Sequence, residues 1–293
     1  MRWRRGASRQ DVIDVRGGGG GRRGGAALPV GGGLGLVGVI LFVAIQLLGG
    51  GGGTGGFNIP AGFDSGARAP SGEPIPAGRD PDRDLADFSV YVFNNAQATW
   101  ERIFAQQGET YDRAKLVLYR DAVDTACGSA SSAAGPFYCP ADKYVYLDVS
   151  FYRDMESRLQ AGGEFAWAYV IAHEVGHHVQ QLRGTSNEVN QIRRSDPDRA
   201  NEASVRLELQ ADCFSGVWAN SVFEAGDLER GDVEEAIRAS EAVGDDRLQS
   251  QAGRQINSDS FTHGSSAQRR AWFERGNESG EPTDCDTFSI DDV

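Results

Sequence analysis

Three of the four histidines of this 293-residue chain lie close together in the segment YVIAHEVGHHVQ. His173, Glu174 and His177 fit the pattern H-E-x-x-H. On a helix, residues four apart share a face, so both imidazoles can reach one tetrahedral zinc ion. Glu174 is rotated by about 100° from His173, so it can act as general base on a zinc-activated water without binding the metal. The alternative is a helix with incidental histidines.

A catalytic zinc ion needs a third protein ligand and an open position. The best candidate is Glu208, which lies 31 residues after His177 in the segment RLELQADCFSG. Asp212 follows on the same helical face, and we expect it to accept the outer N–H of a ligating histidine. Two carboxylates in an otherwise apolar stretch are costly unless a metal and its histidines compensate them. The alternatives are Asp212 as the ligand itself, or an ordinary solvated helix face.

The elements that must position these residues are mostly helices. Apolar periodicity predicts longer helices over 85–108, 164–183, 201–221, 232–244 and 265–276. A short helix is expected near 151–160, and strands are expected near 114–121 and 143–148. The polar residues 185–200 are expected to form a loop that can include a helical turn. The predicted fold class is therefore α+β, mainly helical, with a small sheet.

A basic segment and an apolar segment precede these elements. The net charge of −13 argues against nucleic-acid binding. Residues 1–25 carry seven Arg and two Asp, a net +5, which leaves −18 for the remainder. Residues 26–48 carry no charge and are long enough to span about 30 Å of hydrocarbon as a helix. Arg22 and Arg23 directly before them favour a cytoplasmic N-terminus and an extracytoplasmic domain.

The expected organisation has four parts. Residues 1–25 form a basic cytoplasmic tail, and residues 26–48 form a single transmembrane helix in the cell membrane. Residues 49–84 form a linker rich in Gly and Pro, and residues 85–293 form the folded domain. A cleaved signal peptide is the alternative for the apolar segment. The oligomeric state is not indicated by any feature of the sequence.

All four cysteines lie after the apolar segment, at Cys127, Cys139, Cys213 and Cys285. An even count in an extracytoplasmic domain indicates two disulfides. Three pairings are possible. Pairing Cys127 with Cys139 would close a short loop, and pairing Cys213 with Cys285 would tie the C-terminal tail to a helix. Free buried thiols are the alternative.

HEVGHH followed by ELQAD resembles the glutamate zincins, metallopeptidases with H-E-x-x-H and a downstream Glu ligand. More narrowly, the chain resembles the bacterial neutral zinc metallopeptidase family of single-pass membrane proteins. The matching segments are MRWRRG, ACGSASSAAGPFYCPADKYVYLD, YVIAHEVGHHVQ, ELQADCFSGVWA, GDDRLQ and SFTHGSSAQRRAWFERG. The resemblance implies a zincin-like fold, with His173, His177 and Glu208 as ligands of one zinc ion and Glu174 as the base.

The fourth histidine, His263, lies in THGSSAQRR, which resembles the T-H-P segment of related membrane metallopeptidases, with Gly264 in place of the proline. His263 is a candidate catalytic residue that would hydrogen-bond the oxyanion of the tetrahedral intermediate. The equal alternative is a loop histidine that caps the helix at 265. His178 is expected to support the structure rather than bind metal. Either Arg269 or Arg270 could assist at the site, and the local sequence selects neither.

We expect a membrane-anchored zinc peptidase that hydrolyses peptide bonds of extracytoplasmic proteins or peptides. The alternatives are a non-catalytic zinc-containing binding module and a hydrolase of cell-wall amide bonds. A structural zinc site closes with four protein ligands and needs no neighbouring base. Glu174 therefore favours the peptidase.

Overall fold

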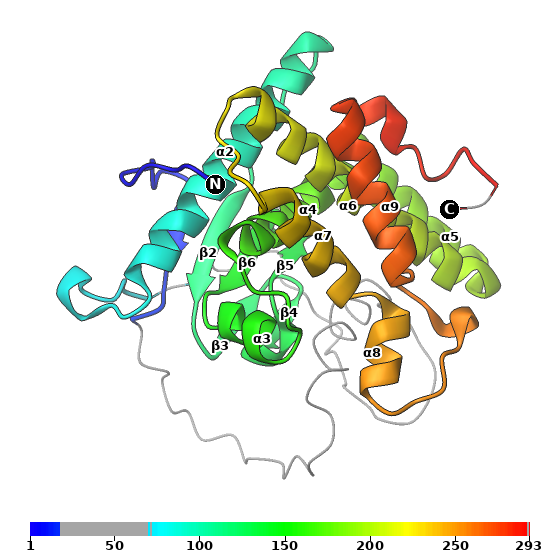
Figure 1. Ribbon diagram of the computed structural model, residues 1–293, viewed down its shortest axis with the longest axis horizontal. Helices are drawn as coiled ribbons and strands as arrows, with labels where there is room; N and C mark the ends of the chain where they lie inside the picture. The colour runs from blue at the N-terminus through cyan, green and yellow to red at the C-terminus, as the bar shows by residue number, and fades with distance from the viewer. Residues whose placement is uncertain (18–69, 71, 292) are drawn as a thin grey trace.

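The computed structural model describes residues 1–17, 70, 72–291 and 293 and is mixed α+β, mainly helical (Figure 1). The main sheet has the order β1-β2-β6-β5. Its strands are β1 (Val12–Asp14), β2 (Lys115–Tyr119), β6 (Tyr144–Asp148) and β5 (Phe137–Cys139). The first three are parallel, whereas β5 runs antiparallel along β6 and forms one edge. A hairpin of β3 (Ala122–Thr125) and β4 (Gly128–Ser131) follows β2.

The two central strands are buried on both faces, which explains their continuous apolar sequences. Leu116 and Leu118 of β2 join the main core with the helices, whereas Val117 and Tyr119 point into a smaller core beneath the hairpin. Alternate residues face opposite sides of a sheet. The strands predicted near 114–121 and 143–148 are confirmed with shorter bounds.

Eight α-helices lie in the described part of the chain. They are α2 (Arg83–Gln106), α3 (Phe151–Ser157), α4 (Glu164–Arg183), α5 (Thr185–Ser195), α6 (Ala200–Glu224), α7 (Asp232–Ala242), α8 (Asp245–Gln251) and α9 (Ser266–Ser279). Helix α4 contacts α2, α6, α7 and strand β5. It therefore lies between the sheet edge and the other helices (Figure 1).

The loop expected over 185–200 is wrong, because Thr185–Ser195 forms α5. Val189 is fully buried and packs with Leu207 of α6, and Ile192 lies beside them. Few apolar residues suffice for this helix because only one narrow stripe of it meets the domain.

Helices α6 and α9 approach each other closely at two glycines. A Cβ at Gly276 would lie 2.0 Å from the carbonyl oxygen of Cys213, and a Cβ at Gly216 would lie 2.2 Å from that of Phe273. No side chain fits at either distance. The two glycines therefore allow a backbone contact between the second half of α9 and the middle of α6.

Residues 1–17, which belong to the segment predicted to be a basic tail, pack on the domain. Strand β1 is hydrogen-bonded to β2, and the Trp3 ring lies 5.4 Å from that of Phe88. Arg16 donates to Asp14 at 2.8 Å and to Asp80 at 2.9 Å.

Residues 72–82, expected to be part of the linker, contact both residues 1–17 and the domain. The carbonyl of Glu73 accepts from the backbone of Gly17 at 2.8 Å, and Asp82 accepts from Arg120 at 2.6 Å. The predicted transmembrane helix over 26–48 lies outside the described residues. Within the residues that the structure describes, no helix combines the length and apolar character that a bilayer crossing requires.

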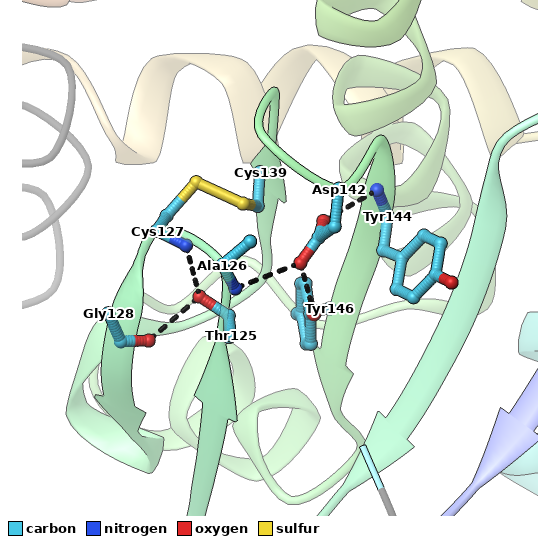
Figure 2. The surroundings of a disulfide bond; sticks show 8 residues. All are labelled: Thr125, Ala126, Cys127, Gly128, Cys139, Asp142, Tyr144 and Tyr146. Atoms are coloured by element: carbon cyan, nitrogen blue, oxygen red, sulfur yellow. Dashed lines mark hydrogen bonds between the residues drawn. A yellow bond between two sulfur atoms is a disulfide. The ribbon is translucent and has the colours of Figure 1, made fainter. Parts of the chain in front are cut away.

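Both disulfides form, Cys127 with Cys139 and Cys213 with Cys285. The first joins the β3–β4 hairpin to the end of edge strand β5 (Figure 2). The second joins α6 to the C-terminal segment after α9. The thiols are therefore all paired, and the alternative of free thiols is wrong.

Candidate metal site

The structure brings His173 and His177 of α4 together with Glu208 of α6. Nε2 of His173 lies 3.3 Å from Oε2 of Glu208, and Nε2 of His177 lies 3.5 Å from Oε1. One ligand atom from each residue lies within 4.8 Å of the others. Zinc bonds of about 2.0–2.1 Å in a tetrahedron separate neighbouring ligand atoms by about 3.3–3.4 Å. The three residues therefore fit a zinc ion.

A glycine inside the motif sets the distance between the two helices. A Cβ at Gly176 would lie 3.2 Å from the carbonyl oxygen of Ala211 and 3.4 Å from Cβ of Phe214, both on α6. These are tight contacts, so a side chain at position 176 would push α6 away. Gly176 thus allows Glu208 to reach the histidines across the helix pair.

Asp212 is fully buried behind His173. Its Oδ1 lies 2.9 Å from Nδ1 of His173 and accepts from the hydroxyl of Tyr169 at 2.5 Å. Arg269 of α9 donates to both carboxylate oxygens, at 2.8 and 2.9 Å. Because Nδ1 faces Asp212, Nε2 on the side of Glu208 is the ring atom that would bind a metal. The Asp212 carboxylate thus orients the imidazole, as expected for the outer partner of a ligand.

The structure distinguishes the two arginines that the sequence left open. Arg269 is 4% exposed and pairs with Asp212, whereas Arg270 is largely exposed and pairs with Glu241 and Glu274. A buried cation beside Asp212 compensates the charge of that carboxylate. Burial opposes ionisation of Asp212, but Arg269 and His173 outweigh it and lower its pKa.

Gln180 holds the second histidine and was missed from the sequence. Its Oε1 lies 2.8 Å from Nδ1 of His177, and its Nε2 donates to the carbonyl of Leu207 at 2.6 Å. The side chain therefore orients His177 and ties α4 to the residue before Glu208. The signal in the sequence is its position, three residues after His177 on the same helix.

Burial and neighbouring charges shape the protonation of the three candidate ligands. Burial opposes a charge on His173, but Asp212 and Glu208 outweigh it and raise its pKa to about 10. Burial lowers the pKa of His177 to about 4. Burial also opposes ionisation of Glu208, but the two histidines hold its pKa well below the usual range. The carboxylate of Glu208 is therefore anionic at neutral pH, as a metal ligand must be.

Glu174 lies beside this cluster and is 7% exposed. Its Oε2 is one of the few buried side-chain polar atoms in the described part of the chain that lack a hydrogen-bond partner. Burial raises the pKa of Glu174 to about 7. A buried carboxylate oxygen without a partner is costly. Glu174 lines a cavity beside the candidate metal ligands. Its Oε2 can therefore accept a hydrogen bond or a proton from a group that reacts there.

His263 lies in the segment between α8 and α9. Its side chain lines the cavity that also contains Glu174 and the three candidate metal ligands. Its backbone N–H donates to Oδ2 of Asp245 at 2.7 Å, and its Nδ1 lies 3.4 Å from Oδ1 of that residue and 2.9 Å from the hydroxyl of Thr262. Ser265, not His263, caps α9, so the capping alternative for His263 is wrong. Asp245 was missed from the sequence because it is 18 residues away.

His178 supports the edge strand rather than the metal cluster. Its Nδ1 lies 3.0 Å from the hydroxyl of Tyr138 in β5, and its Nε2 lies 2.6 Å from the carbonyl of Asp112. Both ring nitrogens are therefore occupied. Burial lowers the pKa of His178 to about 4, so the neutral ring links α4 to the sheet, as expected from its direction on the helix.

These features define a class: an α+β, mainly helical protein with a buried site of two histidines and a glutamate fit for zinc. A family model described as "Putative neutral zinc metallopeptidase" matches residues 1–288, and the chain belongs to this family. No solved structure matches the chain.

Two similar proteins come from Escherichia coli and Mycobacterium tuberculosis. "Uncharacterized protein YpfJ" of Escherichia coli (strain K12) is 51% identical over 206 residues, which is 70% of this chain and 72% of that protein. "Uncharacterized protein Rv2575" of Mycobacterium tuberculosis is 40% identical over 227 residues, which is 74% of this chain and 75% of that protein.

Proposed function

We propose that this protein is a zinc-dependent peptidase with a zincin-like domain. The observation that carries the proposal is the position of Glu174. Its Oε2 has no partner among the described residues, and the residue lines the same cavity as His173, His177 and Glu208. A structural zinc site would close with four protein ligands, whereas the described residues at this site provide three and a neighbouring base.

His173, His177 and Glu208 would hold the metal, with Asp212 and Gln180 fixing the two imidazoles. When bound, zinc supplies Lewis acidity, which polarises the scissile carbonyl and makes water a better nucleophile at neutral pH. Oε2 of Glu174 accepts the proton of the attacking water and returns it to the leaving amine. His263, held by Asp245, donates a hydrogen bond to the oxyanion of the tetrahedral intermediate.

The proposed substrates are extracytoplasmic proteins or peptides. The two disulfides support this location, because such bonds persist mainly in oxidising compartments. Membrane anchoring by residues 26–48 stays a prediction.

The test follows cleavage of an unfolded, fluorescently labelled protein by the full-length chain. We expect cleavage with one zinc ion per chain, loss after removal of the ion by a chelator, and recovery on adding zinc. Cleavage that persists at full rate in protein verified to be zinc-free would overturn the proposal. Failure to bind zinc at stoichiometric level would overturn it as well.

A further inference from the structure

Two glutamine amides link His177 to the C-terminal segment that follows α9. Oε1 of Gln180 lies 2.8 Å from Nδ1 of His177, and Nε2 of Gln180 donates to Oε1 of Gln210 at 3.1 Å. Gln210 of α6 in turn donates from its Nε2 to the backbone carbonyl of Cys285 at 3.1 Å. Gln180 is fully buried and Gln210 is 8% exposed. Each amide therefore depends on its neighbour for a hydrogen-bond partner, because little water reaches either of them.

The backbone carbonyl at the far end fixes the direction of both amides. A carbonyl oxygen can only accept, so the NH2 group of Gln210 faces Cys285 and its oxygen faces Gln180. The NH2 group of Gln180 then donates to Gln210 and to the carbonyl of Leu207, which uses both of its N–H bonds. The oxygen of Gln180 is left for Nδ1 of His177. Nε2 of His177, on the side of the carboxylate ligand, is therefore the ring atom left for a metal.

The C-terminal segment is held on α6 at several points. Cys285 is bonded to Cys213. The guanidinium of Arg206 donates to three backbone carbonyls of the segment, those of Thr287, Ile290 and Asp291. Arg206, Gln210 and Cys213 follow one another at spacings of four and three, so they share one face of the helix. The carbonyl of Cys285 is therefore a fixed acceptor for Gln210 before any metal arrives.

We propose that the C-terminal segment sets the zinc affinity of the site, with Gln210 as the positioning residue that connects Cys285 to the amide of Gln180. The inference rests on the zinc site of the proposed function and adds a residue that acts on His177 through another side chain. Without Gln210, one buried N–H of Gln180 loses its acceptor, which is costly. Gln180 then gains by moving toward another acceptor, and His177 loses the partner that orients it.

The first test measures the zinc affinity of the full-length protein by competition with a chelator. Gln210→Met preserves the length of the side chain and removes both hydrogen bonds. We expect zinc affinity to fall by about threefold to tenfold, the effect of about one hydrogen bond. Urea unfolding of the zinc-free protein measures any loss of stability separately. Unchanged zinc affinity overturns the proposal. If Gln210→Met does not fold, Gln210→Asn takes its place, because the shorter side chain cannot reach both partners.

A second test shows whether Gln210 acts through Gln180. The substitution Gln210→Met is introduced into the wild type and into Gln180→Met, and the two losses of zinc affinity are compared. We expect no further loss in Gln180→Met, because the connection to His177 is already broken there. An equal loss in both proteins overturns the proposal, since Gln210 would then affect the metal by another route.

Thr287→Val is the matched control for detachment of the C-terminal segment. Thr287 is fully buried, and its Oγ1 donates to the backbone carbonyl of Arg206 at 2.7 Å. The substitution therefore removes a buried contact between the segment and α6 but leaves both amides in place. We expect lower stability with unchanged zinc affinity. If Thr287→Val and Gln210→Met weaken zinc binding equally, Gln210 has no specific role and the proposal is overturned.

The two proposals fail in different ways, because zinc affinity is measured without turnover. Coupling between Gln210 and Gln180 in a protein that binds zinc but cleaves nothing would support the positioning role and count against the peptidase. Cleavage by the wild type, with zinc affinity unaffected by Gln210→Met, would support the peptidase and overturn the positioning role. A wild type that binds no zinc would overturn both.

Discussion

Replacing Asp212 by asparagine tests two roles of this buried carboxylate. It is the counter-charge of Arg269, and it is the acceptor that orients the imidazole of His173. Asp212 accepts from Arg269 through two nitrogens at 2.8 and 2.9 Å, and it lies 2.9 Å from Nδ1 of His173. Asp212→Asn leaves the Arg269 cation buried without a counter-charge, which costs about 3–5 kcal/mol. In a domain of this size, each kcal/mol of lost stability lowers Tm by about 2–4 °C, so Tm should fall by roughly 6–20 °C.

The same substitution weakens the orientation of His173, so zinc affinity should fall by about 10–100-fold. Adding Arg269→Met to Asp212→Asn removes the stranded cation. The double variant should regain part of the lost stability but none of the lost zinc affinity. Urea unfolding measures the first quantity, and competition with a chelator measures the second.

Arg270→Met is the matched control, because Arg270 is exposed on the same helix. Surface substitutions of this kind change stability by less than about 0.5 kcal/mol. A buried ion pair must show coupling between its members. If the effects of Asp212→Asn and Arg269→Met on stability simply add, Asp212 and Arg269 do not stabilise the domain as a pair. If the double variant binds zinc as tightly as the wild type, Asp212 does not orient His173.

Three further outcomes follow from the structure. Gly276→Ala places a methyl group 2.0 Å from the carbonyl of Cys213, so the free energy of unfolding should fall by about 3 kcal/mol or more, measured in urea. Gln180→Met should weaken zinc binding by about tenfold in a chelator competition, because His177 loses the partner of its Nδ1. Replacing Cys213 and Cys285, which are 72 residues apart, by serine should cost about 4 kcal/mol, measured by thermal unfolding; an unchanged Tm would contradict this.

The sequence was sufficient to predict the helix that carries His173 and His177, because apolar residues on all sides marked it as buried. It also indicated Glu208, because a carboxylate in an apolar helix needs a partner. Helix α5 was missed since most of its residues are polar. Strand β1 was missed because three residues gain stability only from β2, about a hundred positions later in the chain.

Contacts between distant segments account for the other residues that sequence reasoning missed. Gly216 and Gly276 have a role only where α6 and α9 touch. Asp245 has a role only because its carboxylate contacts the backbone and the ring of His263 in the folded protein. The choice of Arg269 over Arg270 depends on which face of α9 meets Asp212. None of these relations produces a local pattern, because each needs the tertiary arrangement to bring the partners together.

The most direct test of the central claim compares the wild type with Glu174→Gln, after the zinc content of each has been measured. Glutamine has nearly the same shape but cannot accept the proton, and Glu174 is not one of the three candidate ligands. We expect one zinc ion per chain in both proteins. We also expect cleavage of an unfolded protein to fall in the variant by at least about 100-fold. Cleavage at the wild-type rate by zinc-loaded Glu174→Gln would show that Glu174 is not the general base.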